Sequence, residues 1–123
     1  MIYNVQGEPL YVYTGGKFFD PAKPTAVFIH GVLNDHSVWI LQTRYFANHG
    51  WNVLAVDLPG HGRSGGKAPA SVQEAAQSIM ALLDAAGVSK ALLIGHSFGS
   101  LIALHATAEN PSRVSQLMMV GTA

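Results

Sequence analysis

The 123-residue sequence contains no cysteine, which excludes disulfide bonds and thiolate metal sites. Charge is scarce and balanced: seven basic and seven acidic residues make up 11% of the chain, against about 25% charged residues in an average domain. With neither a basic stripe nor a charged tail, nucleic acid and a membrane surface are not expected as partners. No hydrophobic run approaches the roughly 20 residues of a membrane-spanning helix.

Residues 1–13 also lack a positively charged segment followed by an apolar one, so the pattern of a secretory signal peptide is missing. Hydrophobic residues make up 49% of the sequence, as in domains whose strands are covered on both faces. The length fits one domain spanning residues 1–123. We therefore expect a single soluble domain and a cytoplasmic location.

Short apolar runs alternate with helical patterns along the chain. Strands are predicted at 9–16, 25–30, 52–58, 91–95 and 114–120, and helices at 37–49, 72–86 and 98–109. Ser71 and Glu74 form a capping-box pattern at the start of the second helix, and Gly87 is placed to end it. Strands alternating with helices predict the α/β class, with a mostly parallel sheet and helices on both faces.

The segment Gly95-His96-Ser97-Phe98-Gly99 joins a predicted strand to a predicted helix and matches the pattern G-x-S-x-G. In that arrangement the serine lies on a strained turn, with its hydroxyl exposed above the carboxyl end of the sheet and next to a helix N-terminus. The five-residue pattern is common by chance, and an ordinary glycine-bounded turn is the alternative. The strand before it and the helix after it favour Ser97 as a nucleophile.

The segment AVFIHGVLNDHSVW, residues 26–39, is the second signal. A predicted strand ends in His30-Gly31 and turns toward the same edge of the sheet as the serine. Acyl transfer needs two backbone N–H groups that face the developing oxyanion, and Val32 and Phe98 are the candidates for these donors. Alone, this segment would indicate only a loop glycine after a core strand; beside the G-x-S-x-G turn it favours an oxyanion hole.

Four segments, in this order, resemble the α/β-hydrolases that use a serine nucleophile: VFIHGVLNDHSVW, VLAVDLPGHGRS, LLIGHSFGSLIAL and VSQLMMVGTA. The resemblance covers essentially the whole chain and implies Ser97 as the nucleophile, with Val32 and Phe98 as oxyanion donors. It implies hydrolysis of a small-molecule ester, or of a related acyl or carbon–carbon bond, without a cofactor. A serine at position 97 disfavours the branches with an aspartate nucleophile, such as haloalkane dehalogenases and epoxide hydrolases. The positions that would shape the site are His30, Gly31, Asn34, Gly95, His96 and Gly99.

A competing motif lies in the loop at 59–70, where Gly60 to Gly65 reads G-x-G-x-x-G after a predicted strand. Such a motif binds a dinucleotide by opening a helix, but Gly66 and Pro69 interrupt any helix here, and the next predicted strand carries no acid. No cofactor is therefore expected. The resemblance to the hydrolases implies that this is the family's usual loop after the strand, with Asp57 as a structural turn residue. The histidines show no metal-binding spacing such as HExxH, so no metal site is expected either.

The general base is missing from the expected place. The family's triad runs serine, acid, histidine in chain order, yet only His105 and Glu109 follow Ser97, in the reverse order. His105 is eight residues along the helix, about 12 Å away, whereas a base must come within about 2.6–3.2 Å or act through one water. His61, on the glycine-rich loop, is a possible substitute base.

We therefore expect the acid and the histidine beyond residue 123, an incomplete sheet, and no activity from this chain by itself. Strand 114–120 would then be an exposed apolar edge, through which the chain self-associates or pairs with a C-terminal segment. A non-catalytic module that binds a ligand or partner on the same fold is the alternative function.

Overall fold

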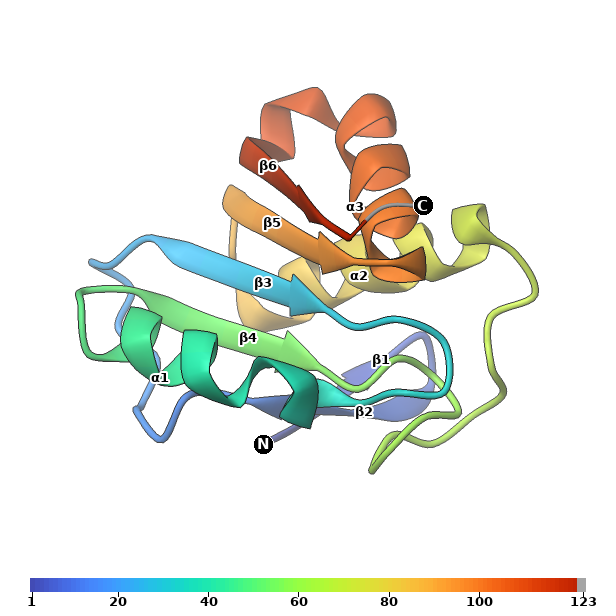
Figure 1. The fold of residues 1–123 in the computed structure, drawn as a ribbon, viewed down its shortest axis with the longest axis horizontal. Coiled ribbons are helices and arrows are strands. Elements are labelled where there is room, and N and C mark those ends of the chain that lie inside the picture. The colour runs from blue at the N-terminus through green and yellow to red at the C-terminus, as the bar shows by residue number, and fades with distance from the viewer. Residues whose placement is uncertain (122–123) are drawn as a thin grey trace.

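The computed structural model describes residues 1–121 and contains a six-stranded sheet flanked by helices (Figure 1). The strands are β1 (Ile2–Val5), β2 (Glu8–Tyr13), β3 (Thr25–Ile29), β4 (Asn52–Val56), β5 (Ala91–His96) and β6 (Val114–Val120), in the spatial order β1-β2-β4-β3-β5-β6. Strand β3 pairs in parallel with β4 and β5, and β5 with β6, whereas β1 and β2 join the sheet antiparallel. The predicted α/β class with a mostly parallel sheet is confirmed.

Helices cover both faces of the sheet, as predicted. Helix α1 (Ile40–Ala47) lies in front of the sheet in Figure 1, while α2 (Val72–Ala86) and α3 (Phe98–Glu109) lie behind it. Each face therefore has its own hydrophobic cluster. The smaller one, on the α1 face, includes Phe28, Trp39 and Ile94. The larger one, beneath α2 and α3, includes Ile79 and Ile102.

Helix α2 forms as its sequence pattern predicts. The Ser71 side chain accepts a hydrogen bond from the Glu74 N–H at 3.0 Å, which caps the first turn. Gly87 ends the helix in the left-handed conformation with φ 71°. The buried stripe falls at helical spacing on Ala75, Ala76, Ile79, Leu82 and Leu83.

The N-terminal region and the first helix differ from the prediction. Strand β1 was not predicted, because its four residues are too short for a periodic signal; a two-residue turn at Gln6 and Gly7, both with positive φ, folds it onto β2. The helix predicted at 37–49 divides into a 3₁₀ turn, His36–Trp39, and the α-helix Ile40–Ala47.

Strand β6 is the last strand of the sheet, and its outer edge pairs with nothing in residues 1–121. Met118, Met119 and Val120 on this strand are 48%, 38% and 39% exposed.

Between β4 and α2, residues 57–71 form turns and bends, so the glycine motif in this loop does not open a helix. Among residues 1–121, no helix has both the length and the apolar composition that crossing a bilayer requires.

Candidate active site

Ser97 lies between β5 and α3 in a strained backbone conformation. Its φ of 56° and ψ of −121° fall outside the regions that L-residues favour. The side chain is exposed, and Phe98 is the first residue of α3, so the Phe98 N–H has no acceptor within the helix. An exposed hydroxyl beside a helix N-terminus is the arrangement that the G-x-S-x-G pattern predicted.

Close packing explains the glycines on either side of Ser97. A β-carbon on Gly95 would overlap the carbonyl oxygen of Gly99, and one on Gly99 would overlap the carbonyl oxygen of Ile29. Neither glycine has a positive φ, so steric space rather than backbone conformation requires them. Helix α3 can therefore start directly against β3 and β5, which fixes its N-terminus over the end of the sheet.

The loop after β3 lies against the serine. A β-carbon built on Gly31 would be 3.4 Å from Ser97 Cβ and 3.4 Å from Asn34 Nδ2, so these two groups border the same small space. The parallel register explains the contact, since Ile29 pairs with Gly95 and the chain leaves both strands in the same direction. Val32 follows Gly31, and its N–H is not used by the hydrogen bond that closes this loop, from Asn34 N–H to Gly31 O.

Strand β6 holds the other side of the serine backbone. The Ser97 N–H donates to Val120 O at 3.1 Å. The neighbouring His96 ring meets Trp39 edge to face, with ring centroids 6.2 Å apart. His96 Nδ1 and Trp39 Nε1 are buried without a hydrogen-bond partner in the part of the chain that the structure describes.

His30 is fully buried, and its hydrogen bonds fix its tautomer. Nε2 accepts from the Leu58 N–H at 3.0 Å, so Nδ1 carries the proton and donates to Gly31 O at 2.6 Å. Burial lowers the pKa of His30 below its usual 6.5. His30 therefore stays neutral and has no free lone pair to accept a proton from Ser97; it ties the loop after β3 to the loop after β4.

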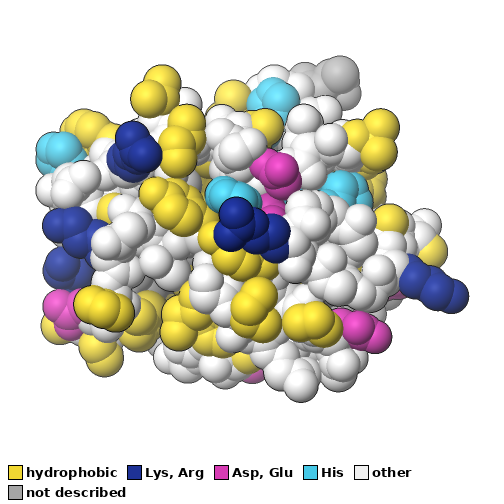
Figure 2. Space-filling view, turned by 90° about the horizontal axis from the view of Figure 1, so that it is seen from below, with side chains coloured by type: hydrophobic (Ala, Val, Ile, Leu, Met, Phe, Trp, Pro, Cys, Tyr) yellow, Lys and Arg dark blue, Asp and Glu magenta, His cyan; other side chains and the backbone are white. Residues whose placement is uncertain are grey.

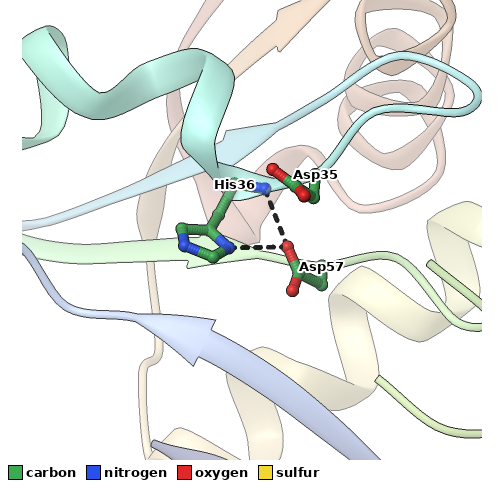
Figure 3. A group of neighbouring side chains, drawn as sticks. All are labelled: Asp35, His36 and Asp57. Atoms are coloured by element: carbon green, nitrogen blue, oxygen red, sulfur yellow. Dashed lines mark hydrogen bonds and ion pairs between the residues drawn. The ribbon is translucent and has the colours of Figure 1, made fainter. Parts of the chain in front are cut away.

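Asp57 is completely buried. It joins the same two loops through its contact with His36 (Figure 3). One carboxylate oxygen accepts from the backbone N–H of His36 at 2.7 Å and from its Nδ1–H at 2.9 Å, and the other accepts from the Arg63 N–H at 2.9 Å. Asp35 stands beside them and accepts from the Ser37 N–H and hydroxyl, which lower the pKa of Asp35. These contacts agree with the interpretation of Asp57 as a structural residue.

Asp35, His36 and Asp57 are also the one group of potential metal ligands found among residues 1–121, with their ligand atoms within 4.8 Å of one another. The Asp57 oxygens and His36 Nδ1 already satisfy one another and the backbone, so the cluster is stable without an ion. The contact between His36 and Asp57 was not predicted from the sequence. Asp57 directly follows β4, but His36 lies seven residues beyond the end of β3, so the sequence carries no local signal for the contact.

His36 is oriented by a buried carboxylate, as a catalytic histidine would be, but it lies in the wrong place. Its ring packs on Tyr11 and Tyr13 of β2, with centroids 5.2 and 5.5 Å away. Strand β2 is three strand spacings from β5, which is roughly 14 Å across the sheet. His36 therefore cannot serve as the base for Ser97.

Two other histidines, His105 and His61, are also unpaired with the Ser97 hydroxyl in residues 1–121. His105 faces Glu109 across 3.9 Å and lines the groove between α2 and α3, away from the start of α3. His61 donates from Nδ1 to Pro59 O, which leaves its Nε2 as an acceptor, and its ring lies 5.2 Å from the His30 ring. Among residues 1–121, the Ser97 hydroxyl forms no hydrogen bond to any of these rings, so His61 as a substitute base stays a prediction.

The surface agrees with the balanced composition. On the face shown in Figure 2, basic, acidic and histidine side chains are interspersed among polar and hydrophobic ones. The G-x-G-x-x-G motif ends at Gly65 and α2 begins only at Val72, so the backbone N–H groups of the motif do not lie at a helix N-terminus that could hold a pyrophosphate.

A sheet of this order, with a strained serine between a strand and a helix at its carboxyl edge, defines an α/β-hydrolase. The family model for the alpha/beta hydrolase fold matches residues 24–123, and the chain belongs to this family. It is 33% identical over 106 residues to the lipase LipV of Mycobacterium tuberculosis, covering 85% of this chain and 40% of that protein. It is 34% identical over 95 residues to an epoxide hydrolase of Caballeronia sordidicola, covering 75% of this chain and 29% of that protein.

A solved structure described as a membrane phospholipase A, a bacterial virulence factor, superposes with a TM-score of 0.88 at 29% identity. The superposition covers 97% of this chain and 38% of that one. The chain thus spans less than half the length of these relatives and corresponds to part of their fold.

Proposed function

We propose that residues 1–123 are the N-terminal part of the catalytic domain of a serine hydrolase. The proposed substrate is a small molecule with a carboxylic ester, or a related acyl or carbon–carbon bond. The observation that carries the proposal is the strained, exposed Ser97 at the start of α3, with the Gly31 loop against it.

In the proposed reaction the Ser97 oxygen attacks the substrate carbonyl carbon and loses its proton to a histidine. The N–H groups of Val32 and Phe98 hold the oxyanion of the tetrahedral intermediate. The carbon–oxygen bond to the leaving alcohol then breaks, the histidine returns the proton to that alcohol, and water hydrolyses the acyl-enzyme in the same way. Gly31, Asn34, His96 and the two packing glycines would shape the site without touching the reacting atoms.

The relatives support ester chemistry to different degrees. A lipase and a phospholipase A carry names that denote ester hydrolysis, whereas the epoxide hydrolase opens a different bond. Because the resemblance implies an aspartate nucleophile for epoxide hydrolases and this chain has Ser97, the ester reaction is the better proposal.

The histidine and acid that complete the triad are proposed to lie outside residues 1–123, which would leave this chain inactive by itself. The exposed edge of β6 would then pair with a C-terminal segment or with a second copy.

A cytoplasmic location stays a prediction. The absence of a hydrogen-bonded base at Ser97 within residues 1–121 favours one alternative, a non-catalytic module that binds a ligand or partner.

A fluorophosphonate probe and p-nitrophenyl acetate separate these possibilities. The chain, its Ser97→Ala variant and the control Ser112→Ala, at another exposed serine, are compared for labelling and for turnover. We expect slow labelling that only Ser97→Ala abolishes, with turnover near the residual of about 10³–10⁴-fold over water that serine proteases keep without a triad member.

Labelling that is equal in all three proteins would refute Ser97 as the nucleophile and favour the binding module. Full turnover by the chain alone would overturn the proposed inactivity and point to His61, whose His61→Gln variant would then be inactive.

A further inference from the structure

The loop that faces Ser97 is a turn of an unusual composition. The Asn34 N–H donates to Gly31 O at 3.2 Å, which closes a four-residue turn, and Leu33 has a φ of 65° while Val32 has a negative one. A four-residue turn in which only the third residue has a positive φ is of type II, and glycine or asparagine is strongly preferred at that third position. A leucine in this conformation is strained, because its Cβ approaches a backbone carbonyl.

Packing within residues 1–121 does not explain the leucine. Leu33 is 91% exposed, more than any other leucine, isoleucine, valine or methionine in residues 1–121, and the neighbouring Val32 is 53% exposed. The side chain therefore contributes little to packing within these residues, while the backbone beneath it carries strain. Such strained positions concentrate at ligand-contacting sites, where the side chain is needed for something other than folding.

The turn lies at the candidate nucleophile. Gly31, its first residue, borders Ser97 Cβ, and Leu33 is two residues further on, so its Cα is within about 7 Å of the Gly31 Cα. The same turn carries Val32, the proposed oxyanion donor, and Asn34, whose amide nitrogen borders the space at Gly31.

We propose that Leu33 is a specificity-determining residue that packs against an apolar acyl or alkyl chain of the substrate. The inference rests on the proposed function and adds the substrate class: esters with an apolar chain of several carbons, rather than acetyl or charged esters. When the substrate binds, its apolar chain covers the exposed Leu33 and Val32 side chains and removes their apolar surface from water. This burial favours binding and is the proposed reason for keeping a leucine in the strained turn.

The strain is tested first by thermal unfolding of the chain with Leu33→Gly and Leu33→Ala. Glycine removes both the strain and the side chain, so the melting temperature of the Leu33→Gly variant should rise by a few degrees. Alanine removes only the side chain and should leave the melting temperature unchanged, since it keeps the positive φ. A lower melting temperature for Leu33→Gly would mean that the leucine supports the fold, which would overturn the inference.

Specificity is tested with two fluorophosphonates, one with an ethyl and one with a decyl chain. The labelling rate of Ser97 with the decyl probe, divided by the rate with the ethyl probe, should fall roughly tenfold in both Leu33 variants. This is the effect expected from losing about two methylene-sized contacts. The control Leu41→Ala, at a leucine on α1 that is 75% exposed, should keep the original ratio. An unchanged ratio in the Leu33 variants would refute the role of Leu33 and leave Ser97 as the nucleophile.

A measurement without reactivity keeps the two proposals separate. 2-Decanone and 2-butanone, which mimic the ester carbonyl, are titrated while the Leu33 methyl resonances are followed by NMR. We expect shifts with 2-decanone only, and roughly tenfold weaker binding to Leu33→Ala. Binding of 2-decanone without labelling of Ser97 would support the contact between Leu33 and an apolar chain and reject the hydrolase proposal. No shift of the Leu33 resonances would reject the role of Leu33.

Discussion

The packing of α3 against the sheet makes Gly99→Ala the sharpest test of the structure. In a free helix this substitution would be stabilising by about 1 kcal/mol, because alanine is the better helix former. Here a β-carbon at position 99 would overlap the Ile29 carbonyl oxygen and lie 2.6 Å from that of His30, closer than β-carbons are found. Both contacts are backbone atoms at the end of β3, so no side chain can rotate away.

Relief therefore requires α3 to move away from β3 by several tenths of an ångström. Overpacking of this kind costs about 1–3 kcal/mol, and contacts with backbone place Gly99→Ala near the upper end. For a chain of this size, about 3 kcal/mol lowers the melting temperature by roughly 10 °C. The same displacement moves the Phe98 N–H relative to Gly31, so labelling of Ser97 should slow as well.

Urea denaturation and thermal melting of Gly99→Ala and Gly87→Ala give the comparison. Gly87 has a φ of 71° and open space around it, so alanine there costs only about 1 kcal/mol, through the left-handed conformation. We expect Gly99→Ala to be the less stable by about 2 kcal/mol. A Gly99→Ala protein as stable as the wild type would show that α3 does not start against β3.

Three further predictions follow from the loops and the sheet edge. Asp57→Ala leaves three N–H donors without their buried acceptor and should cost about 3–5 kcal/mol in urea denaturation; a cost below about 1 kcal/mol would contradict the network. Burial holds the pKa of His30 below 6.5, so its contribution to stability is present above pH 6.5 and lost as the pH falls toward the folded-state pKa. The urea midpoint should therefore drop between pH 7.5 and pH 5, and less so in His30→Asn; equal slopes would argue against a neutral His30. Met118→Lys on the exposed edge of β6 should reduce concentration-dependent association in sedimentation velocity, whereas Ser112→Lys, outside the strand, should not.

The strands and helices were largely predictable, because their signals are local. The runs at 25–30, 52–58 and 91–95 are apolar since they lie in the middle of the sheet, and each forms a strand within two residues of the predicted bounds. The β1 strand was missed, because it is stabilised mainly by pairing with β2 and leaves little trace in its own four residues.

The candidate site was predictable only in part. The order strand, glycine, serine, glycine, helix locates Ser97, because the strained turn needs small neighbours on both sides. The positive φ of Leu33 has no such signal, since leucine is a poor residue for that conformation. The contact between His36 and Asp57 depends on two loops, 21 residues apart, that meet only at the sheet edge.

By itself the sequence determined the α/β class, the alternation of elements and the position of the serine, because hydrophobic periodicity, capping and turn chemistry act over a few residues. The tertiary structure decided which groups surround that serine. Parallel pairing of β3 with β5 sets Gly31 against Ser97, and the sheet order removes His36 from reach. Distances between loops depend on strand order and register, which no single segment encodes.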